Sequence, residues 1–245
     1  MNALRSRGRH PEAAVTAGLI AALAVQNAVP PFATDMYSPA FPQVAADLAT
    51  SATAVGLTFT AFFIGMGLGQ VAGGTISDQQ GRRVPVIVGG VLCSLGALVC
   101  VFAPNIGVLV AGRLLQGFGG GVAAVVGRAV LVDLAHGDRL ASMMSILMAV
   151  SALAPMIAPV AGGAVLSMAT WRMVFWCLVG FGLFMTAMAV VFVPESLPLE
   201  RRSKGGWRRF LAGCRELLGH RRYVGYMLTS SFSSFAMFAY ISSSS

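Results

Sequence analysis

Two ionisable residues stand within otherwise apolar stretches of this sequence, Asp35 near the end of the first stretch and Arg113 inside the fourth. A charge at the centre of a membrane helix costs at least about 2.5–3.5 kcal/mol, so such residues mark functional sites. A carboxylate beside an arginine can take up and release protons as the two groups meet and separate. We therefore expect Asp35 and Arg113 to couple protons to transport. The simpler interpretations are a helix-end carboxylate at the membrane surface and a structural ion pair or carbonyl clamp.

The composition requires a membrane around these residues. Of 245 residues, 56% are hydrophobic and 11% are charged, and about 25% would be charged in a soluble domain. This excludes a soluble enzyme, a disordered chain and a disulfide scaffold. A bilayer-spanning helix needs about 20 apolar residues. Long uncharged runs, the longest divided at Pro104-Asn105, predict seven membrane helices near 14–37, 51–73, 84–103, 106–130, 143–167, 173–194 and 223–245.

The positive charges predict an orientation. With a cytoplasmic N-terminus, the cytoplasmic segments hold all but two of the 17 Lys and Arg residues, Arg113 and Arg172 being the exceptions. This is the positive-inside bias of membrane proteins, and it explains the net charge of +8 without a nucleic-acid partner. The expected cytoplasmic basic residues are Arg5, Arg7, Arg9, Arg82, Arg83, Arg128, Arg139, Arg201, Arg202, Lys204, Arg208, Arg209, Arg215, Arg221 and Arg222.

We expect three parts along the chain: a six-helix transmembrane domain over 1–195, a basic cytoplasmic linker over 196–222, and a truncated seventh membrane helix over 223–245. Within the linker, Trp207, Phe210, Leu211, Cys214, Leu217 and Leu218 follow a helical spacing. This predicts an amphipathic helix on the inner membrane surface, and a solvated linker is the alternative. Because the last apolar run closes in four serines without an anchoring residue, we expect a fragment of a longer protein.

Three further motifs combine polar residues or helix breakers with small residues. Gly74, Asp78, Gly81, Arg82 and Arg83 follow the second apolar run, where Gly81 permits a tight turn and Asp78 can reach Arg82. Gln116 and Gly117 follow Arg113 on the same helix face. In the fifth run two prolines predict a bend, and the glycines after them allow close packing: Pro155, Pro159, Gly162 and Gly163. The cysteines form no CxxC pattern, no metal set stands out, and no nucleophile, base and orienting group occur together, so we expect neither a metal site nor an enzyme.

Taken in order, these motifs resemble the major facilitator superfamily, in particular its twelve-helix drug:proton antiporters of the bicyclomycin/chloramphenicol-resistance type. The Gly74–Arg83 run resembles the loop between helices two and three, and the run from Arg113 to Gly119 resembles the helix-four motif. Thr34 to Pro42, Arg128-Ala129, Asp133, the Pro155–Gly163 run, Trp171-Arg172 and Pro194-Glu195-Ser196 also fit. Two departures stand out: Gln79 replaces the arginine after Asp78, and Ala154 and Ala158 replace the glycines before the prolines.

The resemblance implies an all-α fold with two inverted three-helix repeats, followed here by a seventh helix. It also implies proton-coupled efflux of small amphipathic organic compounds, which gives antibiotic resistance, in a bacterial-type plasma membrane. The proton gradient takes the place of a cofactor. We expect the substrate cavity to be lined by Gln26, Asn27, Met36, Tyr37 and Gln116.

Several alternatives remain. The chain could be an inactive fragment, or a half-transporter that needs its C-terminal half or a second copy. A seven-helix receptor fits the helix count, but a retinal protein needs a lysine in its last helix, and the single lysine, Lys204, lies in a loop. A channel would need a selectivity filter, and no filter motif is visible.

Overall fold

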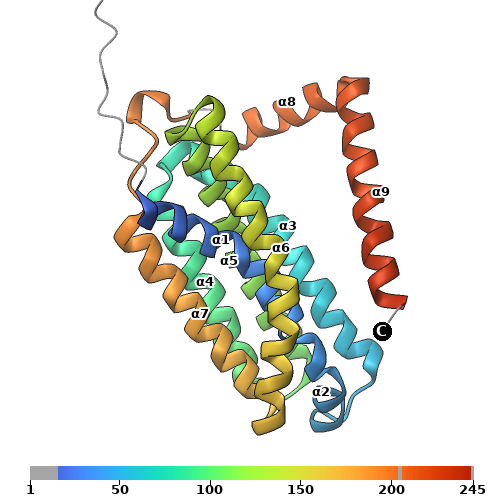
Figure 1. Cartoon of the computed structure of the whole chain (residues 1–245). Helices are drawn as coiled ribbons and strands as arrows, with labels where there is room; N and C mark the ends of the chain where they lie inside the picture. Colours follow the sequence, from blue (N-terminus) through green and yellow to red (C-terminus); the bar gives the residue numbers. More distant parts are fainter. Residues whose placement is uncertain (1–15, 204–205, 244–245) are drawn as a thin grey trace, which may run out of the picture. The chain divides into compact units, whose positions relative to one another are not determined.

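The computed structural model describes residues 16–203 and 206–243, with the backbone alone at 207–209 and 234–243. The predicted basic residues Arg5, Arg7, Arg9 and Lys204 lie outside the described residues. Every regular element in the described part is helical (Figure 1). The long helices of the first unit are α1 (Ala17–Asp35), α3 (Ala52–Gln80), α4 (Arg83–Val101), α5 (Ile106–Leu134), α6 (Gly137–Met168) and α7 (Trp171–Phe192). Shorter elements are η1 (Ser38–Ala40), α2 (Phe41–Asp47) and η2 (Leu199–Arg201).

Six helical segments of the described residues are long and apolar enough to cross a membrane: Ala17–Asp47, α3, α4, α5, α6 and α7. They correspond to the first six predicted spans. The observed helices extend further at one end: α3 continues to Gln80 and α6 begins at Gly137. The polar residues there continue the helix because nothing in them breaks it, so the Gly74–Gln80 part of the predicted loop is helical.

One compact unit ends at Arg202 and a second begins at Ser203. The second unit contains α8 (Gly206–Gly219), which lies where the amphipathic helix was expected, and α9 (Arg221–Ser243). The polar middle of α9 reads Thr-Ser-Ser-Phe-Ser-Ser, and α9 is not among the six apolar segments. That α9 crosses the membrane and that α8 lies on its surface stay predictions.

The packing of the first unit follows a twofold pattern. α3 packs on α5 as α6 packs on α1, α4 packs on α5 as α7 packs on α1, and α4 packs on α7. Exchanging the triplet α1, α3, α4 with the triplet α5, α6, α7 reproduces every one of these pairs. This is the arrangement that two inverted three-helix repeats produce.

Two apolar clusters form the core, one towards each end of the bundle. The first joins α1, α5 and α7 through residues such as Leu23, Val130 and Met185. The second gathers Tyr37, Leu109 and Phe175. We call the end that contains the α3–α4 turn, the α5–α6 turn and residues 193–202 the Arg82 end. The opposite end, with residues 36–51, 102–105 and 169–171, is the Trp171 end.

Candidate functional site

Arg113 is fully enclosed by the bundle. Its helix begins after Asn105, whose side-chain oxygen accepts a hydrogen bond from the backbone N–H of Val108 at 3.0 Å. Two turns into α5, the Arg113 side chain has no exposed surface. Its Nη1 donates to the backbone carbonyl of Ala33 at 2.9 Å and to Oε1 of Gln116 at 2.8 Å. Arg113 therefore faces the bundle interior and not the lipid, and Gln116 lies on its face as its i+3 spacing indicates.

Asp35 is the last residue of α1, and the backbone carbonyl that Arg113 binds belongs to Ala33, two residues earlier in the same helix. The carboxylate is half-buried and accepts a hydrogen bond from the Thr34 hydroxyl at 3.1 Å. It forms no ion pair with Arg113 in this structure. The two groups predicted to act together are thus not paired in this structure, and Arg113 meets the end of α1 through the Ala33 backbone.

The guanidinium of Arg113 is not saturated. Its Nε and Nη2 are buried and have no hydrogen-bond partner among the described residues. An unpartnered buried N–H loses its bonds to water without replacement, and such a group calls for an explanation. These two donors lie in the fork that binds a carboxylate in a bidentate manner.

The five predicted cavity residues contact different helices of the bundle. Gln26 and Gln116 are buried, and Nε2 of Gln26 donates to the backbone carbonyl of Met185 in α7 at 3.2 Å. Met36 and Tyr37 are also buried. Asn27 is half-buried and faces α6, where its Nδ2 lies 2.6 Å from Oγ of Ser151. Tyr37 shares a hydrogen bond of 3.1 Å with Thr58 of α3.

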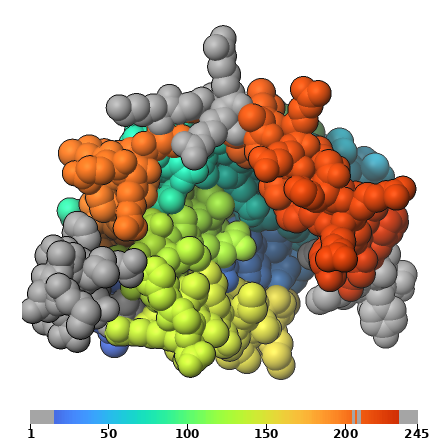
Figure 2. Space-filling model, turned by 90° about the horizontal axis from the view of Figure 1, so that it is seen from above, coloured from blue at the N-terminus to red at the C-terminus, as the bar shows by residue number. Residues whose placement is uncertain are grey.

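Arg82 joins three parts of the bundle at the Arg82 end. Its Nε donates to Asp133 of α5 at 2.9 Å, and its Nη1 donates to Ser77 and Asp78 of α3 at 2.8 and 2.6 Å. The hydroxyl of Ser196, which follows α7, also donates to Asp133. Figure 2 looks onto this end, where the α5–α6 turn (green) lies beside the α3–α4 turn (teal).

Burial disfavours the charged form of Arg82, but its bonds to Asp133 and Asp78 outweigh this cost and raise the pKa of the guanidinium above its ordinary value. A cation with a raised folded-state pKa stabilises the fold at every pH below its unfolded pKa. The contribution of Arg82 is therefore complete at neutral pH and disappears only in strong alkali.

The turn between α3 and α4 is held by a carboxylate. Gly81 has φ of 102°, a conformation that favours glycine, as the predicted turn requires. Glu195 accepts hydrogen bonds from the backbone N–H groups of Arg82 at 2.8 Å and Arg83 at 3.4 Å. A carboxylate at the start of α4 is stabilised by the free N–H groups there. Arg202 lies 3.7 Å from the same carboxylate.

The remaining motif residues are four residues of α6 and Gly74 of α3. α6 is assigned as one continuous helix through Pro155 and Pro159, so the predicted bend stays a prediction. Gly162 lies against the backbone of Met36, since an added Cβ would run into the Met36 carbonyl oxygen. Gly163 and Gly74 have no neighbouring atom within 4 Å of an added Cβ.

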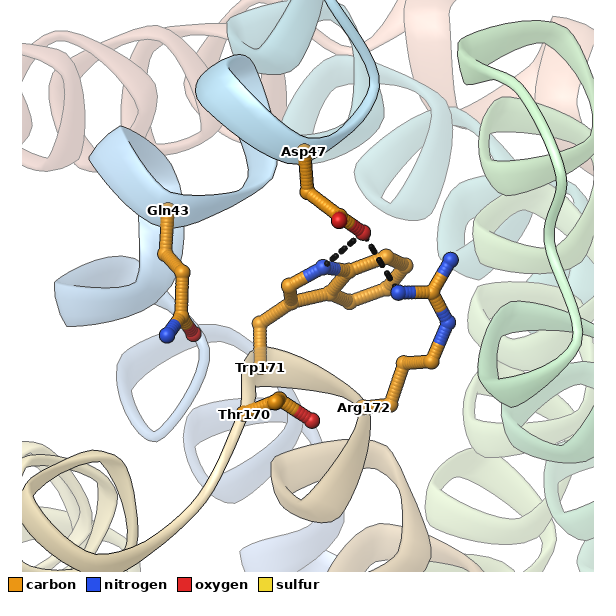
Figure 3. A pocket seen from close by; sticks show the side chains of 5 residues that line it. All are labelled: Gln43, Asp47, Thr170, Trp171 and Arg172. Atoms are coloured by element: carbon orange, nitrogen blue, oxygen red, sulfur yellow. Dashed lines mark hydrogen bonds and ion pairs between the residues drawn. The ribbon is translucent and has the colours of Figure 1, made fainter.

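A small pocket of about 90 Å³ opens at the Trp171 end, lined by Gln43, Asp47, Thr170, Trp171 and Arg172 (Figure 3). The Trp171 indole N–H and the Arg172 guanidinium both donate to Oδ2 of Asp47, at 2.9 and 2.5 Å. None of the five predicted cavity residues lines this pocket. Within the described residues, no three His, Cys, Asp or Glu side chains are grouped to hold a metal ion.

Several site residues were not singled out from the sequence. Asp133 and Glu195 were named only for the family resemblance and were given no role, although an acid at a helix end on the basic side of the membrane is a detectable signal. The rings of Tyr37, Phe62 and Phe175 surround Arg113, with its guanidinium carbon 4.9, 4.4 and 5.9 Å from their centroids. Among many phenylalanines in apolar helices, nothing in the sequence distinguishes Phe62 or Phe175.

Comparison with known proteins agrees with this architecture. The family description Major Facilitator Superfamily matches residues 23–245, so the chain belongs to this superfamily of transporters and is a multi-pass membrane protein, not an enzyme.

Three relatives of this chain are similar to it over most of its length. The chain is 40% identical over 214 residues to the uncharacterized MFS-type transporter YdgK of Bacillus subtilis, covering 86% of this chain and 53% of that relative. It is 33% identical to the bicyclomycin resistance protein homolog of Haemophilus influenzae (92% and 57%) and 28% identical to the multidrug resistance protein MdtL of Salmonella heidelberg (87% and 54%). The chain thus spans about half the length of these relatives.

Solved structures share the fold. The D-xylose–proton symporter matches with a TM-score of 0.65 at 16% identity, covering 73% of this chain and 48% of the symporter. The human organic anion transporter MFSD10 matches with a TM-score of 0.61 at 18% identity, covering 79% and 50%. The predicted all-α fold of this superfamily is confirmed.

Proposed function

We propose that this chain forms half of a proton-coupled exporter of small amphipathic organic compounds, with Asp35 and Arg113 as its coupling pair. One observation carries the coupling role: a fully buried guanidinium has two unpartnered N–H donors and binds the Ala33 carbonyl near the end of α1. Asp35, the last residue of that helix, is a half-buried carboxylate with no cation among the described residues. Such a pair can exist separated, as here, or joined. Proton binding to the carboxylate favours separation, and proton release favours the ion pair.

The substrate class rests on the relatives. Two of them are named for bicyclomycin resistance and multidrug resistance. The two amides and the ring around α1, at Gln26, Asn27 and Tyr37, offer both apolar contact and hydrogen bonds once helices separate. We assign these residues, with Met36 and Gln116, to the substrate path. No bound cofactor is needed, since a proton gradient supplies the free energy.

We assign Arg82 and the side chains that it binds, Ser77, Asp78 and Asp133, to gating and call them the Arg82 cluster. It links α3, the start of α4, α5 and the segment after α7 through one guanidinium and its acceptors. Movement of these helices against one another must exchange those bonds. On the positive-inside rule, this end faces the cytoplasm of a bacterial-type plasma membrane, with the N-terminus on the same side. A cysteine at Ser203 should then resist a membrane-impermeant thiol reagent in intact cells and react after permeabilisation, and strong labelling of intact cells would reverse the orientation.

Alternating access needs two halves that move about a central site. Because the relatives are about twice as long as this chain, we propose that transport requires a second half that further sequence supplies, with a second copy of this chain as the alternative. Cells that produce residues 1–245 alone should accumulate a fluorescent drug as control cells do. Efflux from such cells that an uncoupler abolishes would instead indicate a working dimer of this chain. The alternative, an inert half, predicts no efflux under any pairing.

The coupling role is tested in an assembly that contains both halves. Asp35→Asn should abolish uphill drug efflux driven by a pH gradient while drug binding persists, because the amide cannot carry the proton. Asp138→Asn, at an exposed carboxylate at the start of α6, is the matched control and should leave efflux unchanged. Normal uphill efflux by Asp35→Asn would assign the proton to another group.

Arg113→Lys tests the geometry of the pair. Lysine keeps the charge but loses the planar fork, so we expect efflux to fall at least about tenfold, and Arg113→Ala to fall as far or further. Full activity with lysine would show that a point charge is sufficient.

A further inference from the structure

Within the described part of the chain, Arg113 is a buried cation without a counter-ion. The four ion pairs of the described residues involve Arg82, Arg172 and Arg202, and none reaches Arg113. Its hydrogen bonds to Ala33 and Gln116 use Nη1 alone. Removing a charge from water without a partner is strongly unfavourable, so other groups must stabilise the guanidinium in this state.

Three aromatic rings stand where such stabilisation is needed. The guanidinium carbon lies 4.4 Å from the ring centroid of Phe62, 4.9 Å from that of Tyr37 and 5.9 Å from that of Phe175. A cation within about 6 Å of a ring centroid is attracted by the negative face of the ring, most strongly where water is absent. All three rings are fully buried.

The rings are held rigidly by their own contacts. The Tyr37 hydroxyl is bonded to Thr58, whose hydroxyl donates to the carbonyl of Val55 at 2.6 Å. The rings of Tyr37 and Phe175 are 5.0 Å apart, and Phe175 in turn meets Trp171 edge-on. The backbone of Phe62 lies directly against Gly117, one turn after Arg113 on α5.

We propose that Tyr37, Phe62 and Phe175 form an aromatic cage that positions the coupling arginine. The cage stabilises the guanidinium while it has no carboxylate partner and keeps Nε and Nη2 free to bind one. The rings come from the segment after α1, from α3 and from α7, so displacement of any of these against α5 changes the cage. The identity of the carboxylate, Asp35, rests on the proposed function, whereas the cage itself rests on the contacts above.

The test weakens the ring face without changing the shape of the side chain. Phenylalanine analogues with one, two and three fluorines are placed at Phe62 of the full chain, because fluorine withdraws electron density from the face that attracts a cation. We expect the melting temperature of the purified protein to fall stepwise, by about 2–6 °C in all. In the Arg113→Met background the same series should be flat.

Phe181 provides the matched control, since its ring stacks on Phe32 at 5.0 Å and the guanidinium of Arg113 lies over other rings. Its fluorine series should not show the stepwise fall. Equal slopes at Phe62 and Phe181, or a slope at Phe62 that persists in Arg113→Met, would overturn the cage.

A second measurement tests positioning in the complete two-half transporter. Three fluorines at Phe62 should slow drug efflux about three- to thirtyfold with little change in the drug concentration that gives half the maximal rate. An unchanged rate would overturn the positioning role. If the fluorine series holds but Asp35→Asn still transports uphill, the cage stands and the proposed coupling residue is wrong. If Asp35→Asn is inactive and the fluorine series is flat, Asp35 stands as the coupling residue and the aromatic cage is wrong.

Discussion

α3 packs on α5 and α6 packs on α1 in equivalent positions of the twofold pattern. The two interfaces nevertheless differ in the groups that meet there. α3 and α5 meet backbone to backbone. A Cβ added to Gly65 or Gly69 would run into the carbonyl oxygens of Leu114 or Phe118, and one added to Gly117 would run into that of Phe62. Small residues permit such close approach between membrane helices.

α1 and α6 meet largely through side chains. Pro31 has no N–H to donate to the carbonyl of Asn27 one turn earlier, and the Ser151 hydroxyl of α6 donates there instead at 3.4 Å. The Asn27 amide donates in turn to Ser151 and to the carbonyl of Leu147. Among the glycines of α6, Gly162 alone meets the backbone of the α1 side, at Met36.

The two interfaces differ in how firmly they hold a helix: α5 is fixed by backbone contact, whereas α6 is held by hydrogen bonds that can be exchanged. In an apolar 18-residue stretch of α5, 67% of the residues are buried, against 17% in such a stretch of α6. If α5 slid along α3, its close backbone packing would be broken and nothing would replace it, whereas hydrogen bonds between side chains can be exchanged for others at little cost. We infer that α5 holds Arg113 in place while α6 is free to move along α1.

The largest expected effect is at the backbone contact. Gly117→Val should prevent folding, because the new side chain meets the backbone of Phe62 and neither helix can withdraw without breaking the rest of its packing. The yield of monodisperse protein in detergent, measured by size-exclusion chromatography, should fall close to zero. Gly67→Val on α3, where an added Cβ meets nothing within 4 Å, should keep a normal yield. A normal yield for Gly117→Val would mean that the two helices are not in backbone contact.

Arg82 fastens the end of α3 to α5, and its loss should be the next largest effect. Arg82→Met leaves Asp133, whose side chain is 21% exposed, without its cation. We expect a loss of about 2–4 kcal/mol of folding free energy, measured by denaturant or thermal unfolding in detergent. Arg83→Met is the control: the Arg83 side chain is exposed and donates to the Val190 carbonyl, so its removal should cost little. Equal losses for both variants would contradict a role for the Asp133 pair.

Gly162→Val tests the single close approach of α6. The substitution meets the Met36 carbonyl as Gly117→Val meets that of Phe62, but α6 can shift outwards because it is packed loosely on its other neighbours. We expect a folded protein that is less stable by about 1–3 kcal/mol. Gly163→Val, one residue on and facing open space, should match the parent. A yield as low as that of Gly117→Val would show that α6 is as fixed as α5.

The smallest expected effect is at the side-chain bonds. Asn27→Ala removes the donor to Ser151 and Leu147 and should cost about 1 kcal/mol. Hydrogen exchange of backbone amides should rise in α6 and not in α5. Ser145→Ala, whose hydroxyl donates within its own helix to Ala141, should leave exchange unchanged. Faster exchange spread equally over both helices would remove the distinction between them.

Features that depend on one segment were predictable. The apolar runs located six membrane-length helices because the cost of exposing polar groups to lipid acts on each helix separately. The burial of Arg113 followed from the same cost. The contact between Asp78 and Arg82 followed from their spacing of four residues, and the Gly81 turn from its conformational freedom.

Features that depend on how two helices meet were decided by the tertiary structure alone. The rings around Arg113, the Asp133 partner of Arg82 and the Asn27–Ser151 bonds each join residues far apart in the chain. Which residues face one another is set by the rotation and depth at which the helices pack. Those are fixed jointly by small residues on both partners, such as Gly65 and Gly117, and no single segment contains that information.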